Sequence, residues 1–168
     1  MPERKKKEGK LVPEFYELKC KQLMNKKTWD LPLIERKKDI NEVLSILCGR
    51  SHVWVVEDME SKELVGVITE HDILSTLAPP KLPPYIFGIP DIRSFHYGTA
   101  KIAEDIMSKK PITCDPEDKV LDALLKMIRC GIRRLPIVKD KKIIGELTLH
   151  HLIIKYYAAT QYHSIVEE

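Results

Sequence analysis

The sequence lacks any run of about 18 apolar residues, the length that a membrane-spanning helix needs. Residues 1–10 are charged rather than apolar, so they do not match a secretory signal peptide. Glycine and proline are scarce, at 7 and 11 of 168 residues, which excludes a collagen-like or wholly disordered chain. With 43% hydrophobic and 32% charged residues, the composition predicts a globular cytoplasmic protein without a membrane segment.

No cysteine belongs to a Cys-x-x-Cys pair, the spacing typical of zinc sites and redox motifs. We therefore expect reduced, buried thiols at all four positions, which are Cys20, Cys48, Cys114 and Cys130. Two adjacent histidines, His150 and His151, would diverge on a helix, and neither has a second ligand four residues on. The sequence predicts no metal site.

The net charge of +3 comes largely from one run of basic residues at positions 4–7. We expect this run to be solvated, within a basic N-terminal arm and lead-in that spans residues 1–19. The other charges are nearly balanced and lack the interleaved aromatic residues of a phosphate-tracking surface. Nucleic acid is therefore not an expected partner.

Two segments, starting at Met24 and Met107, run through the same order of features with a period of about 80 residues. In the first, apolar spacing predicts a helix over residues 40–47 that Gly49 ends, and strands over 31–34, 53–56 and 64–68. Thr69 is expected to cap a closing helix that stops before the prolines at 79 and 80.

The second segment repeats this pattern. We expect a strand over residues 111–113, a helix that starts at 115–118 and ends at Gly131, and a hairpin of strands 135–138 and 143–147. Thr148 is expected to cap a last helix through about Tyr157.

The predicted fold class is α/β, with two βαββα repeats packed about a pseudo-twofold axis, because a half of about 55 residues has a thin core alone. The predicted boundaries are an arm at residues 1–19, a first repeat at 20–78, a connector at 79–104, a second repeat at 105–159 and a tail at 160–168. The connector carries prolines and aromatics, so we expect it to pack on the repeats or on a partner.

Two short motifs within this duplicated unit are informative. Residues 66–72 read Gly-Val-Ile-Thr-Glu-His-Asp, and residues 131–138 read Gly-Ile-Arg-Arg-Leu-Pro-Ile-Val. Because of these two motifs, the sequence resembles a tandem cystathionine-β-synthase (CBS) domain pair, or Bateman module. The resemblance covers about residues 20–157. The resemblance implies a non-catalytic sensor that binds AMP, ADP, ATP, S-adenosylmethionine or NAD between the repeats and needs no cofactor.

Thr69 and Asp72 fall in the first turn of one predicted helix. A carboxylate there can accept both hydroxyls of a ribose, and the helix amides suit a nearby phosphate. The same spacing is also a capping box, in which the acid binds only the cap amide. By resemblance the ligand site comprises Val67, Thr69, His71, Asp72, Ile112, Thr113, Arg133, Arg134, Pro136 and His150.

In that resemblance Ile112 and Thr113 would lie beside the adenine, whereas Arg133 and Arg134 would approach the phosphates with His71 and His150 nearby. Neighbouring strand residues point to opposite faces, so one arginine could reach the ligand while the other is solvated.

The pseudo-equivalent cleft departs from the family pattern. His151 follows Thr148 where the ribose-binding acid is expected, and Ser51, His52 and Trp54 replace the arginine-and-proline element. We therefore predict one competent site and one degenerate cleft, where stacking of a base on Trp54 would leave weak binding.

The expected function is regulatory: a homodimer that transmits ligand binding to a separate, unidentified protein. The alternative is an assembly module that needs no ligand. An enzyme is not expected, because no Ser-His-Asp arrangement, P-loop or paired-carboxylate pattern stands out.

Overall fold

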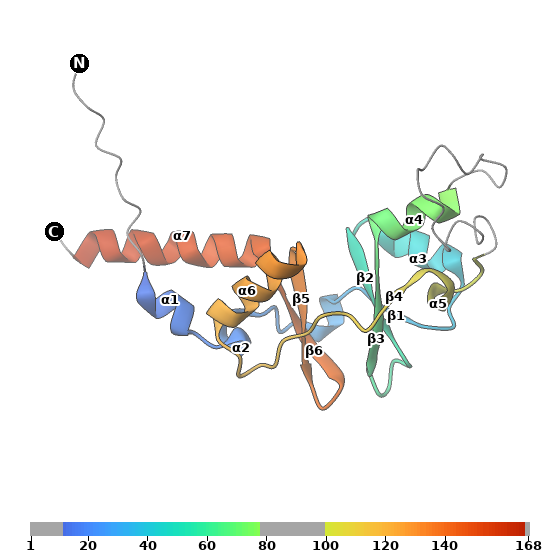
Figure 1. The fold of residues 1–168 in the computed structure, drawn as a ribbon, viewed down its shortest axis with the longest axis horizontal. Helices are drawn as coiled ribbons and strands as arrows, with labels where there is room; N and C mark the ends of the chain where they lie inside the picture. Colours follow the sequence, from blue (N-terminus) through green and yellow to red (C-terminus); the bar gives the residue numbers. More distant parts are fainter. Residues whose placement is uncertain (1–11, 78–99, 167–168) are drawn as a thin grey trace, which may run out of the picture.

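The computed structural model of the protein describes residues 12–77 and 100–166, whose helices and strands form two units side by side (Figure 1). A four-stranded sheet, in the order β1-β2-β3-β4, supports the first unit, and the β5-β6 hairpin supports the second. This arrangement confirms the predicted α/β class and duplicated organisation. No helix in these two ranges is long and apolar enough to cross a membrane. Most of the predicted connector, residues 79–99, lies outside the described residues.

The first unit follows the predicted pattern closely. Its main elements are β1 (Leu33–Glu35), α3 (Ile40–Leu47), β2 (His52–Val56), β3 (Leu64–Thr69) and α4 (Glu70–Leu77). Strand β2 is rich in β-branched and aromatic residues, and all five of its residues are buried. Asp39 caps α3 by accepting the Asn41 amide. Strand β1 starts two residues later than predicted, after Pro32, whose ring nitrogen has no hydrogen to donate.

The second unit is built on α6 (Val120–Cys130), β5 (Arg134–Lys139), β6 (Lys142–Thr148) and α7 (Leu149–Val166). Gly131 ends α6 with a φ of 64°, as predicted for a helix stop. The hairpin turns through Asp140 and Lys141, which both have positive φ, and this matches the right-handed twist of the strands.

Three predictions for the second repeat are wrong. Residues 115–118 form a turn, because the Asp115 side chain accepts the Glu117 amide, and α6 begins only at Val120. No strand forms over 111–113, where the positive φ of Lys110 bends the chain and a single bridge joins Cys114 to Ile137. Helix α7 continues past the predicted end at Tyr157, since residues 158–161 contain neither proline nor glycine.

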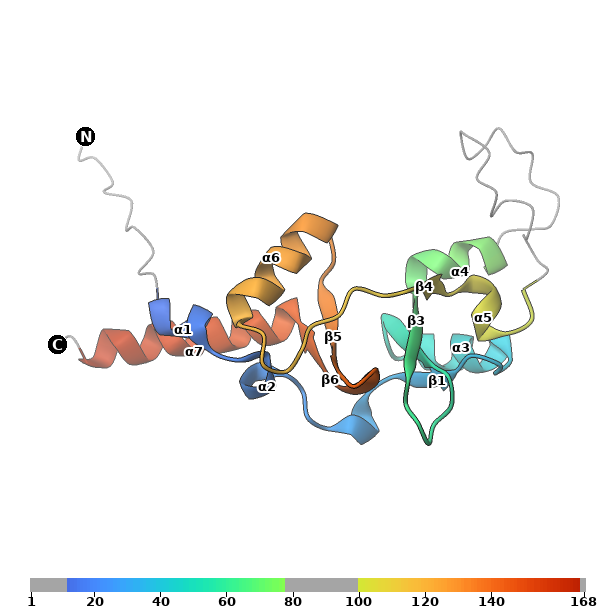
Figure 2. The same ribbon diagram turned by 60° about the horizontal axis from the view of Figure 1, so that its bottom comes forward.

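Each repeat sends its opening segment to the other unit (Figure 2). Helix α1 (Pro13–Glu17) precedes the first repeat and α2 (Cys20–Leu23) opens it, yet Phe15 and Cys20 share a core with Val120 and Leu135. Conversely, α5 (Ala103–Ile106) and β4 (Ser108–Lys109) complete the first unit, where β4 pairs with β3. The chain therefore crosses between the units twice.

A glycine in each sheet makes room for these crossing segments. A Cβ atom on Gly66 would lie 2.5 Å from the sulfur of Met107, and one on Gly145 would lie 2.7 Å from the Asn25 carbonyl oxygen. The Asn25 amide donates to the Glu146 carbonyl at 2.9 Å, so this segment is held by the backbone of β6. The close approach explains why both repeats carry glycine at this position.

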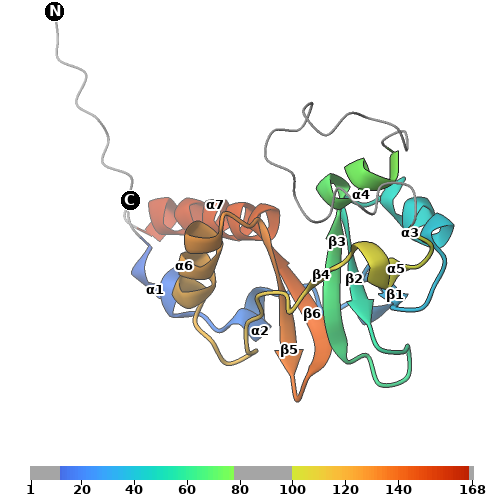
Figure 3. The ribbon, with the colours of Figure 1, turned by 45° about the vertical axis from the view of Figure 1, so that its right-hand side comes forward.

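The two hairpins meet directly (Figure 3). The Leu64 amide donates to the Lys141 carbonyl at 3.0 Å, and the Ile143 amide donates to the Lys62 carbonyl at 3.1 Å. Ile143 also packs with Trp54 in a small core between the units, together with Leu31 and Val56. Backbone and apolar contacts thus join the repeats. A 3-10 turn, η1 (Thr28–Asp30), lies between α2 and β1.

Candidate functional site

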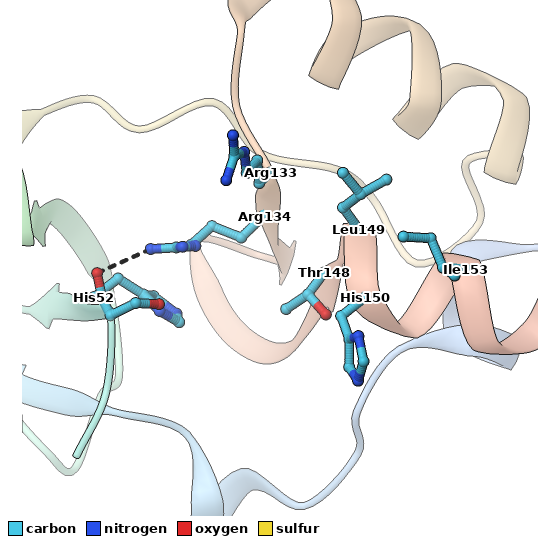
Figure 4. A pocket seen from close by; sticks show the side chains of 8 residues that line it. His52, Arg133, Arg134, Thr148, Leu149, His150 and Ile153 are labelled. Carbon is cyan, nitrogen blue, oxygen red and sulfur yellow. Dashed lines mark hydrogen bonds between the residues drawn. The ribbon is translucent and has the colours of Figure 1, made fainter.

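A pocket of about 360 Å³ lies between the two units, at the end of the sheets where α7 begins (Figure 4). This volume is within the range of ordinary small-molecule sites. Ser51 and His52 line it from the first unit; Arg133, Arg134, Thr148, Leu149, His150 and Ile153 line it from the second. Both repeats are therefore needed to form it.

Strand register places the charged groups of the pocket. Arg134 begins β5 and pairs with Thr148, the last residue of β6, so the arginine lies next to the start of α7. The Thr148 hydroxyl accepts the His151 amide at 3.2 Å, which confirms Thr148 as the cap of this helix. The positive end of the α7 dipole and the arginine thus lie at one end of the sheet.

The two arginines differ in their contacts. Arg134 is half-buried and donates to the Ser51 carbonyl at 3.1 Å, whereas Arg133 is exposed and points in a different direction (Figure 4). Burial lowers the pKa of Arg134, and Arg133 adds to this, although Glu146 and Glu70 oppose it. Neither arginine forms an ion pair with a carboxylate in the described parts of the chain. This concentration of positive charge suits an anion.

A buried polar cluster lies behind the pocket. The Glu146 carboxylate oxygen Oε2 lies 2.8 Å from His52 Nε2 and accepts the Trp54 indole N–H at 2.8 Å. Glu146 and His52 are only 5% and 6% exposed. Burial acts to raise the pKa of Glu146, but the hydrogen bonds from His52 and Trp54 outweigh it, so the pKa is lowered.

This cluster corrects one expectation. Trp54 is 2% exposed and its ring lies edge-on to His52, so it offers no face on which a base could stack. Glu146 was not among the site residues predicted from the sequence. The available signal was a single acid within the otherwise apolar run from Ile143 to Leu147.

Thr69 and Asp72 lie at the equivalent position of the first unit, outside the lining of the pocket. Asp72 Oδ2 accepts the Thr69 amide at 2.7 Å and the Thr69 hydroxyl at 2.8 Å. This is the capping arrangement that the sequence left open as the alternative to ribose binding.

The other predicted site residues are dispersed. His71 is exposed on α4, Val67 packs near the core between the units and Pro136 is fully buried in β5. Ile112 is exposed, and the Thr113 carbonyl accepts the Lys126 ammonium at 3.0 Å. The pocket therefore unites three residues of the predicted ligand site, Arg133, Arg134 and His150, with Ser51, His52 and Thr148, which the sequence had assigned to the degenerate cleft. Leu149 and Ile153 were not predicted in either cleft. Among the described residues, no cluster of His, Cys, Asp and Glu could hold a metal ion. The expectation of four buried thiols is wrong for Cys48 and Cys130, which are exposed near the ends of α3 and α6.

Comparisons with known proteins bear on the fold of the chain. A family model for the CBS domain matches residues 20–79 and 103–157. The structure of CBSX2 from Arabidopsis thaliana in complex with AMP superposes with a TM-score of 0.65 at 22% identity, over 83% of this chain and 96% of that one. The CBS domain pair of protein MJ0100, in complex with 5′-methylthioadenosine and S-adenosyl-L-methionine, gives 0.61 at 24% identity, over 83% and 99%. These likenesses show the fold.

Curated relatives match only in part. Homoserine O-acetyltransferase of Methanosphaera stadtmanae is 29% identical over 117 residues, which are 68% of this chain and 20% of that protein. The chain spans between 20% and 42% of the length of the first three curated relatives that it matches.

Proposed function

This chain belongs to the CBS domain family, as a tandem pair, and from that premise we propose that it is a regulatory module that binds an adenosine-containing ligand between its repeats. The observation that carries the proposal is the pocket of about 360 Å³, which both units line and which holds two arginines at the start of a helix. The solved relatives named with AMP, S-adenosyl-L-methionine and 5′-methylthioadenosine support the ligand class.

The lining suggests how such a ligand would lie. Its phosphate would contact Arg134 at the positive end of the α7 dipole, with His150 beside it, because the arginine supplies positive charge and N–H donors. Leu149 and Ile153 lie four residues apart on α7, and they would form an apolar wall for the sugar and base.

We propose that Thr69 and Asp72 form a second position at which the ligand can bind. A ribose there would have to compete with the two hydrogen bonds that Asp72 accepts from Thr69. We therefore expect weaker binding at Asp72 than in the pocket.

Regulation would follow from the fact that both units line the pocket. A ligand that binds only when both units are in place stabilises their arrangement and shifts the population toward it. No catalytic step is part of the proposal. The ligand's effect would reach a separate protein, whose identity the chain does not specify.

Thermal unfolding of the full chain with AMP, ADP, ATP, S-adenosylmethionine, NAD and adenosine tests the proposal. A ligand at 100 times its dissociation constant adds about 2.7 kcal/mol to the free energy of unfolding. We expect a stabilising shift with a phosphate-bearing ligand and a smaller one with adenosine. No shift with any of the six compounds would overturn the proposal and favour an assembly module.

Three variants assign the site. Arg134→Gln keeps a donor for the Ser51 carbonyl but removes the charge, and Arg129→Gln makes the same change at an exposed position on α6. We expect the shift to be lost in Arg134→Gln and kept in Arg129→Gln. Loss in Asp72→Asn instead would assign the ligand to the Thr69–Asp72 position.

We also propose that the protein self-associates. Leu121, Leu125 and Ile128 are exposed at helical spacing along α6, where they form an apolar stripe on the surface. A second copy of the chain would bury this stripe, as expected for a homodimer.

A further inference from the structure

One wall of the pocket contains a buried histidine that pairs with a buried acid. His52 begins β2 and lines the pocket, yet its side chain is only 7% exposed. Its Nε2 lies 2.8 Å from the Glu146 carboxylate, whereas its Nδ1 has no hydrogen-bond partner within the described parts of the chain. Buried polar atoms are rarely left without a partner, so this ring nitrogen needs an explanation.

The hydrogen bond to Glu146 fixes which ring nitrogen of His52 carries a hydrogen. Burial acts to raise the pKa of Glu146, but the hydrogen bonds from His52 and Trp54 lower it below its usual value, so the carboxylate is ionised near neutral pH. A carboxylate only accepts, and His52 Nε2 is therefore the donor. In the neutral ring Nδ1 then carries only a lone pair, and a second proton would make it a donor and the ring a cation.

While His52 is neutral, this cluster carries one negative charge behind a pocket that is suited to an anion. Arg134 reaches across the pocket to the carbonyl of Ser51, the residue before His52 (Figure 4). The charge of Glu146 acts on Arg134, whose pKa is lowered by burial and raised by this carboxylate. A phosphate beside Arg134 would therefore be repelled by Glu146 while the arginine attracts it. A proton on His52 would bring the charge of the pair to zero and remove this repulsion.

We propose that the pocket takes up a proton when it binds an anionic ligand, and that His52 holds this proton. The inference rests on the proposed function and adds that the module responds to pH as well as to its ligand. The protonated ring would lie between two negative groups, which favour its charged form, and a phosphate oxygen can accept from Nδ1. By linkage, protonation then favours ligand binding as much as binding favours protonation.

Other charged groups near the pair come from both units. They are Arg133 and Arg134 at the start of β5, His150 and His151 of α7, and Glu70 of α4. Arginine and glutamate keep their charges between about pH 6 and 8, so only the histidines titrate there. His151 acts on Glu146 from outside the pocket lining, and His150 lines the pocket on its exposed side. His52 both contacts Glu146 and lines the pocket, so the proton is assigned to it.

Isothermal titration calorimetry of the full chain with AMP tests the inference. Titrations at about pH 6, 7 and 8, each in two buffers of different ionisation enthalpy, count the protons taken up. The parent is compared with His52→Gln, whose amide can still donate to Glu146 but cannot hold a second proton. The phosphate of AMP titrates near pH 6 itself, and the difference between the two proteins cancels this contribution. From pH 8 to pH 6, the affinity of the parent is expected to rise about tenfold more than that of the variant.

His163→Gln is the matched control, since residue 163 lies on α7 about 20 Å along the helix from Leu149. Its proton uptake is expected to equal that of the parent. If AMP bound with the same proton uptake in the parent and in His52→Gln, or if His151→Gln alone abolished the uptake, the inference would be wrong while the proposed function stood. If AMP bound at none of the pH values, the inference would also fall, and the comparison of six compounds would still decide the proposed function.

A measurement on the parent protein does not depend on whether His52→Gln folds. The ¹⁵N chemical shift of His52 Nδ1 distinguishes a bare ring nitrogen from a protonated one. We expect this shift to move toward the protonated value when AMP is added at about pH 7, whereas a histidine with only a structural role would keep its shift. A bare Nδ1 in the AMP-saturated protein at about pH 6 would overturn the inference.

Discussion

Glu146 of the second unit accepts the indole N–H of Trp54 in the first, at 2.8 Å, inside the contact between the repeats. The carboxylate oxygen that accepts it also lies 2.8 Å from His52 Nε2. The pocket is lined by His52 and lies next to this cluster. The buried acid is therefore a direct polar link between the repeats, immediately behind the proposed ligand site.

Trp54→Phe removes the indole donor but keeps an aromatic ring in the core. The free energy of unfolding of this variant is expected to be about 1–2 kcal/mol lower than that of the parent, because one hydrogen bond to a buried charge is lost. Urea denaturation followed by circular dichroism measures this. Trp29→Phe is the matched control, since Trp29 is 82% exposed, and its stability is expected to match the parent. A Trp54→Phe protein as stable as Trp29→Phe would contradict the structural role of the contact.

The stability contributed by Glu146 is expected to depend on pH. Its pKa is lowered from 4.5 in the folded protein, so its contribution is complete above that value and is lost as the pH falls below it. The difference in unfolding free energy between the parent and Glu146→Gln is therefore expected to narrow below about pH 4.5. Urea titrations at several pH values test this, with Glu60→Gln as an exposed control. If the difference in unfolding free energy instead grew as the pH fell, the predicted pH dependence of Glu146 would be wrong.

Gly145→Ala is expected to destabilise the protein by about 1–3 kcal/mol, as overpacking does in cores. The new Cβ would lie 2.7 Å from the Asn25 carbonyl oxygen, which belongs to the backbone and cannot simply rotate away. In Gly66→Ala the new Cβ would contact the flexible side chain of Met107 instead. The loss of stability is therefore expected to be smaller than in Gly145→Ala, and Met107→Ala is expected to relieve it. Thermal unfolding compares the variants.

Gly49→Ala is the control for both glycine substitutions, because no atom lies within 4 Å of its Cβ position. A change within about 0.5 kcal/mol is expected there. If Gly145→Ala also fell in that range, the crossing segment would have to be held less tightly than the structure shows.

Ile128→Glu places a charge in the apolar stripe of α6, where Ile128 is 75% exposed. Self-association is expected to weaken at least about tenfold, since the charge would be desolvated in the interface. Sedimentation equilibrium over a range of concentrations measures this. Met59→Glu, at an exposed position of the β2–β3 loop, should leave association unchanged. A parent protein that stays monomeric throughout would rule out the proposed dimer.

Local patterns predicted most of the fold. The alternation of apolar runs with the polar turn at residues 139–142 located both strands of the second hairpin, and Gly131 marked the end of α6. Helix starts were harder, because Asp115 can cap a turn as readily as a helix and only the downstream contacts decide.

The site was predicted less completely than the fold. Arg133, Arg134 and His150 were assigned to a ligand site, and all three line the pocket. Their neighbours there were expected to be Thr69 and Asp72, but the register of β5 with β6 brings them to Thr148 instead. Spacing along the chain cannot show which strand end an arginine will face.

Contacts between residues far apart in the chain were the hardest feature to predict from the sequence. Nothing in the residues around Cys20 or Met24 indicates that they pack on the second unit and not on the repeat that follows them. Likewise, Glu146 has no partner nearby in sequence, since His52 and Trp54 belong to the other repeat. Contacts between elements so far apart depend on the tertiary fold.

The exchange of opening segments makes the two halves of the chain mutually dependent. A fragment that began at residue 100 would carry α5 and β4 without the sheet that they extend, and it would lack the segment that covers Gly145. The remaining fragment would carry α2 without the core that buries Cys20. A cut in the connector would therefore release no self-sufficient half, and the two pieces are expected to fold only on each other, as complementing fragments do.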